Sequence, residues 1–168
     1  MEELKSKHVF RIASASDLDL LYDAEKRCFK GDSLNREDLE AMLERFPEHF
    51  LLLYEEDVFI GYLISCPSSL ERFEDTLFQG KAYEEEGSQL YLLGLGILPE
   101  YQGRGYGSLL IERLKEDAFR QKRKRIILTC REELVSFYSR CGFETAGDSR
   151  SCFAGKRWKE MILVLNDD

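Results

Sequence analysis

The stretch from residue 90 to residue 114 constrains the possible fold more than any other part of the chain. It opens with the apolar run LYLLGLGIL, which is short enough to be a buried strand. The sequence PEYQGRGYG follows, and the closing segment SLLIERL places Leu110, Ile111 and Leu114 on one helical face. A strand that enters a helix through a glycine-rich turn can bind phosphate, because glycine lets the backbone come close and free N–H groups at the helix start attract negative oxygens. We therefore expect an anion site where this helix begins.

The glycine spacing distinguishes between phosphate-binding motifs. A P-loop has lysine and then serine or threonine after its last glycine, whereas serine and leucine follow Gly107. A dinucleotide fingerprint has two residues between its second and third glycines, whereas only Tyr106 separates Gly105 from Gly107. The pattern that fits is Gln-x-x-Gly-x-Gly, which starts at Gln102 after a strand that ends in Pro-Glu.

This pattern resembles the acyl-CoA loop of the GNAT N-acetyltransferase superfamily. The resemblance implies that the loop amides hold the CoA pyrophosphate and that the backbone of the preceding strand pairs with the pantetheine arm. The cofactor-binding residues that it implies are Leu95, Gly96, Ile97, Gln102, Gly103, Arg104, Gly105, Tyr106, Gly107 and Ser108. Gly94 and Gly96 also suit a β-bulge in that strand. The alternative is a glycine turn that only packs a helix onto a sheet.

A second motif, FYSRCGF, covers residues 137–143. Within the superfamily, residues 129–143 look most similar to the arylalkylamine N-acetyltransferase branch. The resemblance implies that Tyr138 is the general acid that protonates the leaving thiolate. The alternative for Tyr138 is a half-buried tyrosine whose hydroxyl finds some partner.

The general base is harder to identify from the sequence. The two histidines that this branch often carries on its central strand correspond to Tyr91 and Leu93 here. Tyr91 is therefore a catalytic candidate only as a residue that orders a water, and the acidic run at residues 84–86 is an alternative proton acceptor. A covalent route through Cys130 or Cys141 is disfavoured, because no histidine stands in a motif with either thiol and buried cysteines are commonly structural.

Apolar periodicity and turn signals predict the element order β-α-α-β-β-β-α-β-α-β-β. Ser16 and Asn35 are the expected N-caps of the first two helices, and Pro67 is expected to end the third strand. Apolar residues between positions 70 and 78 predict a further short helix. The expected strands cover residues 8–13, 50–54, 58–65, 90–98, 126–130, 143–153 and 158–165.

This order is also that of the GNAT domain, which the chain resembles over nearly its whole length. We therefore expect one domain over residues 1–168 of the α/β (α+β) class, with the GNAT fold. Its centre is expected to be a mixed, mostly antiparallel, twisted sheet of about seven strands flanked by helices.

The composition narrows the choice of partners and compartment. The formal net charge of −8 argues against nucleic-acid binding. The basic run at residues 120–125 is better explained by a helix C-terminus, where the helix dipole favours cations, than by a nucleic-acid patch. The polar N-terminus shows no signal-peptide pattern, and no apolar run approaches a membrane span. The five scattered cysteines favour a reduced cytoplasm. We expect no metal and no membrane partner, and we leave a homodimer open.

The function expected from the resemblance is acetyl-CoA-dependent transfer of an acetyl group to the primary amine of a small molecule, by direct attack in a ternary complex. Polyamines, diamines and arylalkylamines are all candidate acceptors. The acidic run at residues 84–86 favours a di- or polyamine if it lines the entrance. The alternative, which such charge runs favour, is a solvated and mobile loop. The alternatives are a protein N-terminal or lysine acetyltransferase and a non-catalytic acyl-CoA-binding sensor module.

Overall fold

The computed structural model describes residues 7–165 of the chain. Its centre is a seven-stranded sheet with the strand order β1-β2-β3-β4-β5-β7-β6. Neighbouring strands are antiparallel except for β4 and β5, which are parallel. This confirms the predicted mixed, mostly antiparallel sheet. The strands are β1 (His8–Ile12), β2 (Phe50–Glu55), β3 (Val58–Ser68), β4 (Gln89–Ile97), β5 (Arg125–Cys130), β6 (Glu144–Asp148) and β7 (Lys159–Val164).

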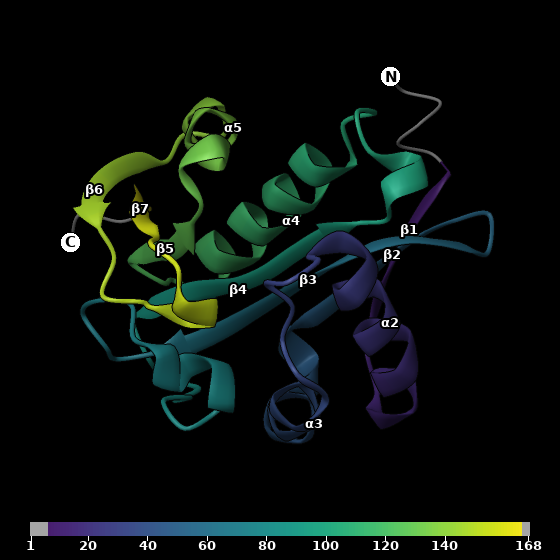
Figure 1. The fold of residues 1–168 in the computed structure, drawn as a ribbon, viewed down its shortest axis with the longest axis horizontal. Helices are drawn as coiled ribbons and strands as arrows, with labels where there is room; N and C mark the ends of the chain where they lie inside the picture. The colour runs from purple at the N-terminus through teal and green to yellow at the C-terminus, as the bar shows by residue number, and fades with distance from the viewer. Residues whose placement is uncertain (1–6, 166–168) are drawn as a thin grey trace.

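Helices cover both faces of this sheet (Figure 1). Helices α2 (Leu18–Cys28) and α3 (Arg36–Arg45) lie on one face, and α4 (Tyr106–Arg120) and α5 (Val135–Arg140) lie on the other. Because both faces are covered, β2 can be apolar at every position from Phe50 to Leu53.

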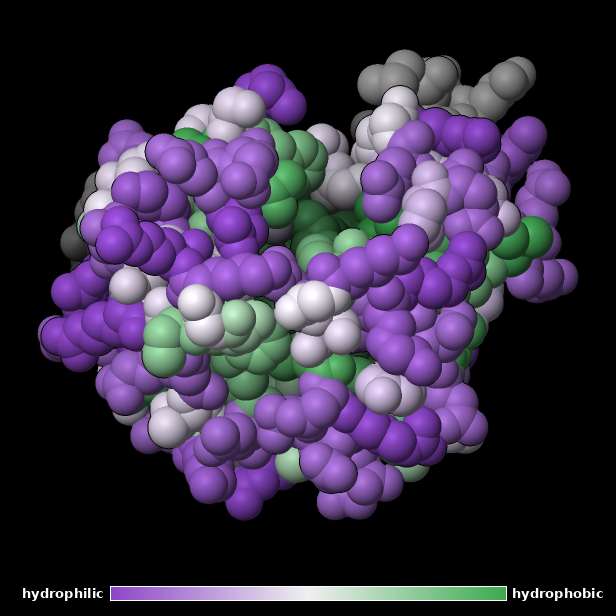
Figure 2. Space-filling model, viewed as in Figure 1, coloured by the Kyte–Doolittle hydropathy of each residue, from purple (hydrophilic) through white to green (hydrophobic). Residues whose placement is uncertain are grey.

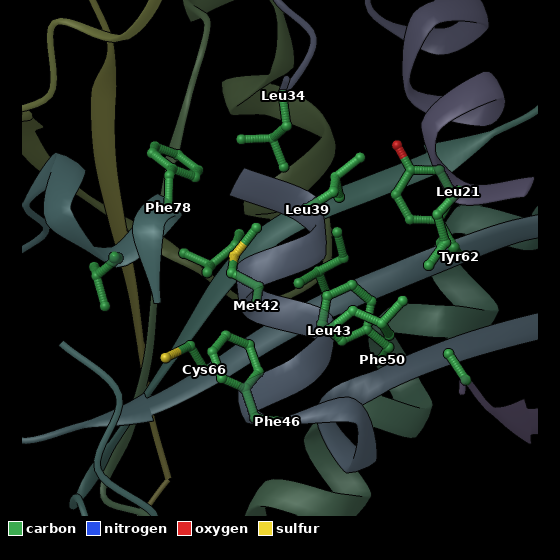
Figure 3. Packing of buried hydrophobic residues seen from close by; sticks show 14 of the residues in the cluster. Leu21, Leu34, Leu39, Met42, Leu43, Phe46, Phe50, Tyr62, Cys66 and Phe78 are labelled. Carbon is green, nitrogen blue, oxygen red and sulfur yellow. The ribbon is translucent and has the colours of Figure 1, made fainter. Parts of the chain in front are cut away.

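Alternate residues of β2 accordingly belong to different apolar clusters. Phe50 and Leu52 pack into the cluster under α2 and α3, which Figure 3 shows from close by, whereas Leu51 and Leu53 pack into the cluster under α4. The sheet is therefore held from both sides, and this arrangement fixes the position of β4 at its centre.

The start of the first long helix differs from the prediction. The hydroxyl of Ser16, the expected cap, pairs with the hydroxyl of Ser14 at 2.8 Å. The turn before α2 is closed instead by Asp17, whose carboxylate accepts the backbone N–H of Ser14 at 2.8 Å and two hydrogen bonds from Arg11. The second predicted cap is confirmed, because the side chain of Asn35 accepts the N–H of Asp38 at 2.8 Å.

Strand β3 does not end at Pro67 as predicted. Pro67 pairs with Leu90 of β4, and the strand continues to Ser68. On its other side, β3 pairs with β2 only as far as Ile64. At Pro67 no strand remains on that side to accept a backbone N–H, so the N–H that proline lacks is not needed there. Proline is tolerated there because it interrupts no ladder.

Two further segments are shorter than predicted. The helix expected between residues 70 and 78 is only a 3₁₀ turn at Asp75–Gln79, and β6 ends at Asp148 rather than continuing to residue 153. A short turn at Phe153–Gly155, with Ala154 at φ 57°, bends the chain toward β7. Among residues 7–165, no helix is long and apolar enough to cross a membrane.

Candidate active site

Strands β4 and β5 separate halfway along β4. Their pairing runs from Gln89 to Leu92, although β4 continues to Ile97. On the other side of β4 the register with β3 shifts by one residue at Leu93, which confirms the bulge expected in this strand. The second half of β4 therefore turns one edge of its backbone toward a space between the two parallel strands.

An outer cavity of about 720 Å³ opens along this edge. All of the predicted cofactor-binding residues line it except Arg104, whose guanidinium lies 5.8 Å from the centroid of the Tyr101 ring. Figure 2 shows a hollow with apolar residues on its floor near the middle of the viewed face. The residues that line the outer cavity are Cys28, Phe29, Leu95, Gly96, Ile97, Tyr101, Gln102, Gly103, Gly105, Tyr106, Gly107, Ser108, Leu134, Phe137, Tyr138, Arg140 and Cys141.

The glycine loop presents free backbone amides to this cavity. Gly103 and Gly105 have φ angles of 78° and 89°, in the left-handed region that favours glycine. Helix α4 begins at Tyr106, and its first backbone bond runs from Leu109 N–H to the Gly105 carbonyl. The amides of residues 106–108 precede that bond, and they can donate to an anion. The Tyr106 hydroxyl donates to Glu55, so its side chain anchors the helix to β2.

An inner cavity of about 120 Å³ continues from the outer one into the space between the strands. Both cavities share four lining residues, Phe29, Leu95, Leu134 and Tyr138. The inner cavity is also lined by Glu25, Asp32, Leu34, Phe78, Leu92, Leu93, Gly94, Leu128, Thr129, Cys130, Arg131, Phe153 and Trp158. The roomier outer space suits a large ligand, whereas the inner space suits a smaller one.

Tyr138 lies where the two cavities meet. Its side chain is buried, and this burial, together with the thiols of Cys130 and Cys141, raises the pKa of its phenol. The hydroxyl is therefore protonated at neutral pH and able to donate. The general-acid role itself stays a prediction.

Tyr91, the other predicted catalytic residue, is kept apart from Tyr138. Its side chain is fully buried, its ring packs edge-on against Phe73, and its hydroxyl donates to the Leu70 carbonyl. Tyr91 lines neither the outer nor the inner cavity. Its position gives no support to a role in ordering a water at the site.

The structure adds a site residue that the sequence reasoning missed. Glu25 of α2 lines the inner cavity and is only 2% exposed. One carboxylate oxygen accepts the N–H of Leu34 at 2.8 Å, and the other accepts the hydroxyl of Tyr62. Burial raises the pKa of Glu25, against the opposing effect of these two hydrogen bonds. The available signal was a glutamate at helical spacing from Leu21, on the apolar face of α2.

The cysteines near the site are poor nucleophiles. Burial raises the pKa of the Cys130 thiol to about 11, and burial also raises the pKa of Cys141. Both thiols are therefore protonated at neutral pH, whereas covalent catalysis requires the thiolate. This agrees with the expectation that they are structural.

The acidic run at residues 84–86 lines neither cavity, so the structure gives no support to a place at the entrance. The Glu85 carboxylate bonds to His49 at 2.8 Å and to Arg123 at 3.0 Å. Arg123 also donates to the carbonyls of Glu85 and Gly87. The run is thereby tied to the opposite end of β4. Potential metal-ligand atoms of Glu48, His49 and Glu85 lie within 4.8 Å of one another. Arg123, however, already balances the charge of Glu85.

Comparison with known proteins identifies the family. Residues 18–143 match the model of the acetyltransferase (GNAT) family, and the chain belongs to this family of N-acetyltransferases. A relative from Bacillus subtilis, named "Probable hydrolase YhcX", is 29% identical over 140 residues. The aligned region covers 76% of this chain but only 27% of the length of YhcX.

Two solved structures share the fold. The GphF GNAT-like decarboxylase in complex with isobutyryl-CoA has a TM-score of 0.81 at 19% identity, with 94% of this chain and 100% of that chain covered. Naa50 of Arabidopsis thaliana, in complex with the bisubstrate analogue CoA-Ac-MVNAL, has a TM-score of 0.71 at 18% identity, with 93% and 97% covered. Proteins with this fold thus bind CoA compounds.

Replacing Gly105 with valine is expected to weaken CoA binding by roughly tenfold or more, because a β-branched residue is strained in the left-handed region and would enter the open space beside the loop. Isothermal titration with CoA measures the change. Gly147→Val is the matched control, since Gly147 has a φ of 91° in β6 and lines neither cavity. Unchanged affinity in folded Gly105→Val would refute the loop assignment.

Proposed function

We propose that this protein transfers the acetyl group of acetyl-CoA to the primary amine of a small molecule, by direct attack in a ternary complex. The observation that carries the proposal is the meeting of the outer and inner cavities at Tyr138, beside the open edge of β4. CoA would enter from the outer cavity and the amine from the inner one, so that the thioester comes to lie between them.

The backbone provides the contacts for CoA. The amides of residues 106–108 would hold the pyrophosphate, and the edge of β4 would pair with the pantetheine arm. The Ile97 carbonyl already accepts hydrogen bonds from Gln102 at 3.0 Å and from the Cys28 thiol at 3.3 Å. The pantetheine amides would therefore pair chiefly with Leu95, which lines both cavities.

The chemical step forms one bond and breaks another. The amine nitrogen attacks the thioester carbonyl carbon, a nitrogen–carbon bond forms, and the carbon–sulfur bond breaks with its electron pair passing to sulfur. Tyr138 would donate its proton to the sulfur. Burial keeps the Tyr138 hydroxyl protonated until the thiolate forms beside it, so a proton is available at that point.

The walls of the inner cavity favour an apolar amine. Most of its large side chains are apolar or aromatic, among them Phe29, Leu34, Phe78, Phe153 and Trp158. Asp32 also lines it, but Lys156 already pairs with this carboxylate. An arylalkylamine therefore fits better than a diamine or polyamine, whose further charges would lack a partner.

A CoA-thiol release assay with a panel of amines tests the function. Amine-dependent release, with the acetylated amine identified by mass spectrometry, is the expected result. Release without amine would indicate hydrolysis, acetylation of peptides alone would indicate a protein acetyltransferase, and acetyl-CoA binding without turnover would indicate a sensor module. A cytoplasmic location and a homodimer stay predictions.

A further inference from the structure

The buried Glu25 carboxylate is held close to β4 through a second buried side chain. Tyr62 of β3 stands opposite Gly96 of β4 in the sheet. A Cβ added to Gly96 would lie 2.6 Å from the Tyr62 hydroxyl oxygen and 2.5 Å from its ring. The absence of a side chain at Gly96 thus makes room for the phenol, whose hydroxyl donates to Glu25. In Figure 3 this hydroxyl points away from the apolar Leu43 and Phe50.

The orientation of the carboxylate is fixed from two sides. The backbone N–H of Leu34 and the hydroxyl of Tyr62 each occupy one of its oxygens. These two donors come from different elements, the loop before α3 and strand β3. A carboxylate held this way keeps its remaining lone pairs in a fixed position. Because Glu25 lines the inner cavity, those lone pairs are available to a bound amine.

We propose that Glu25 is the proton acceptor for the attacking amine and that Tyr62 is the positioning residue that holds the Glu25 carboxylate beside β4. The inference rests on the proposed function and adds the base that the reaction requires. In the step, the amine nitrogen bonds to the carbonyl carbon and passes one proton to Glu25, while the sulfur takes the electron pair of the broken bond and a proton from Tyr138. Water returns the Glu25 proton to Tyr138, so no further reactant is needed.

Other ionisable side chains that lie near Glu25 or share its cavity include Cys28, Asp32, Tyr62 and Arg131. Cys28, on the same helix, has a pKa raised to about 11 by burial and by Glu25, so it is neutral. Asp32 and Arg131 share the inner cavity, and Asp32 is paired with Lys156. Tyr62 faces Glu25 from β3, and its pKa is raised by burial and by Glu25, so it keeps its proton. Cys28 and Tyr62 therefore stay protonated, and Glu25 is the neighbouring carboxylate whose pKa burial raises.

The pH dependence of the reaction follows with a definite sign. The base works only when ionised, so kcat/KM falls as the pH drops through the pKa of Glu25, which burial has raised above the usual carboxylate range. Removing the Tyr62 hydroxyl removes a hydrogen bond that lowers this pKa. Tyr62→Phe therefore moves the acid limb of the pH profile, the range in which kcat/KM falls as the pH drops, to higher pH.

The experiment compares four proteins with one reactive amine over the pH range of activity. Glu25→Gln should lower kcat/KM by about a hundredfold or more while acetyl-CoA affinity stays within twofold of wild type. Tyr62→Phe should shift the acid limb upward. Tyr54→Phe is the control, since Tyr54 bonds to Arg11 and lines neither cavity, and the acid limb of this variant should not move. The profile is repeated with a second amine of different basicity. An acid limb set by Glu25 keeps its position, whereas one set by protonation of the amine moves with the basicity of the amine.

Each result has one meaning. Wild-type turnover that persists in Glu25→Gln overturns the role of Glu25 but leaves the proposed function standing. Absence of amine-dependent turnover in the wild type overturns the proposed function itself, and the base role with it. If circular dichroism shows that Glu25→Gln does not fold, the position of the acid limb in Tyr62→Phe tests the proposal instead. An unshifted acid limb in Tyr62→Phe, or an equal shift in Tyr54→Phe, overturns the positioning role.

Discussion

Tyr138→Phe is expected to lower kcat by roughly a hundredfold to ten-thousandfold, which is the usual contribution of general acid catalysis. The substitution removes only the hydroxyl, so the ring keeps its edge-on contacts with Phe137 and Phe143. The amides proposed to hold the pyrophosphate lie on α4 and are untouched, so acetyl-CoA affinity should stay close to wild type. The loss should appear in kcat because the proton transfer occurs in the bound complex.

The measurement is single-turnover thiol release, which shows whether chemistry limits the rate. Tyr54→Phe provides a matched control, since its hydroxyl accepts a hydrogen bond from Arg11 and the residue lines neither cavity. Turnover at the wild-type rate in Tyr138→Phe, with chemistry limiting, would show that Tyr138 is not the acid.

The fold and the conformation of the glycine loop could be predicted because their signals are local. The apolar run of β4, the loop glycines and the face of α4 all lie within residues 90–114, and backbone conformation decides what each does. The left-handed angles at Gly103 and Gly105 illustrate this, since the residue type alone indicates where the chain can turn tightly.

The base could not be predicted because it depends on contacts between distant segments. Glu25 and Tyr62 are 37 positions apart, and Gly96 lies a further strand away. No spacing rule relates these residues. Only the pairing of β3 with β4 and the packing of α2 on the sheet bring them together. A lone glutamate on an apolar helix face indicates an unusual environment, but it does not identify the partner.

The acidic run shows the opposite error, in which a local pattern suggests a function that the fold does not support. Three consecutive glutamates suggest an attractive surface, yet Glu85 is held by Arg123 and His49 at the far end of β4. The pairing partner of Glu85 lies 38 positions later in the chain. Charge composition therefore did not indicate where the charge would be located relative to the cavity.

The apolar walls of the inner cavity predict which amine the protein prefers as acceptor. Phenylethylamine is expected to exceed spermidine in kcat/KM by about tenfold or more. Burying a phenyl ring against Phe153 and Trp158 removes on the order of 100 Å² of apolar surface from water, which is worth about 2 kcal/mol or roughly thirtyfold in binding. Spermidine would instead bring further ammonium groups into a cavity where Asp32 is already paired.

Steady-state kinetics with both amines at low and high salt checks this preference. Screening acts on exposed charges over about 8 Å at physiological ionic strength, so binding driven by apolar burial should change little with salt. Glu84→Gln combined with Glu86→Gln is the control, because neither side chain lines a cavity, and it should leave both KM values unchanged. A higher kcat/KM for spermidine that falls with salt and with this double substitution would contradict the assignment of the inner cavity as the amine site. The acceptor would then approach along the acidic run, and the inner cavity would hold only the acyl group.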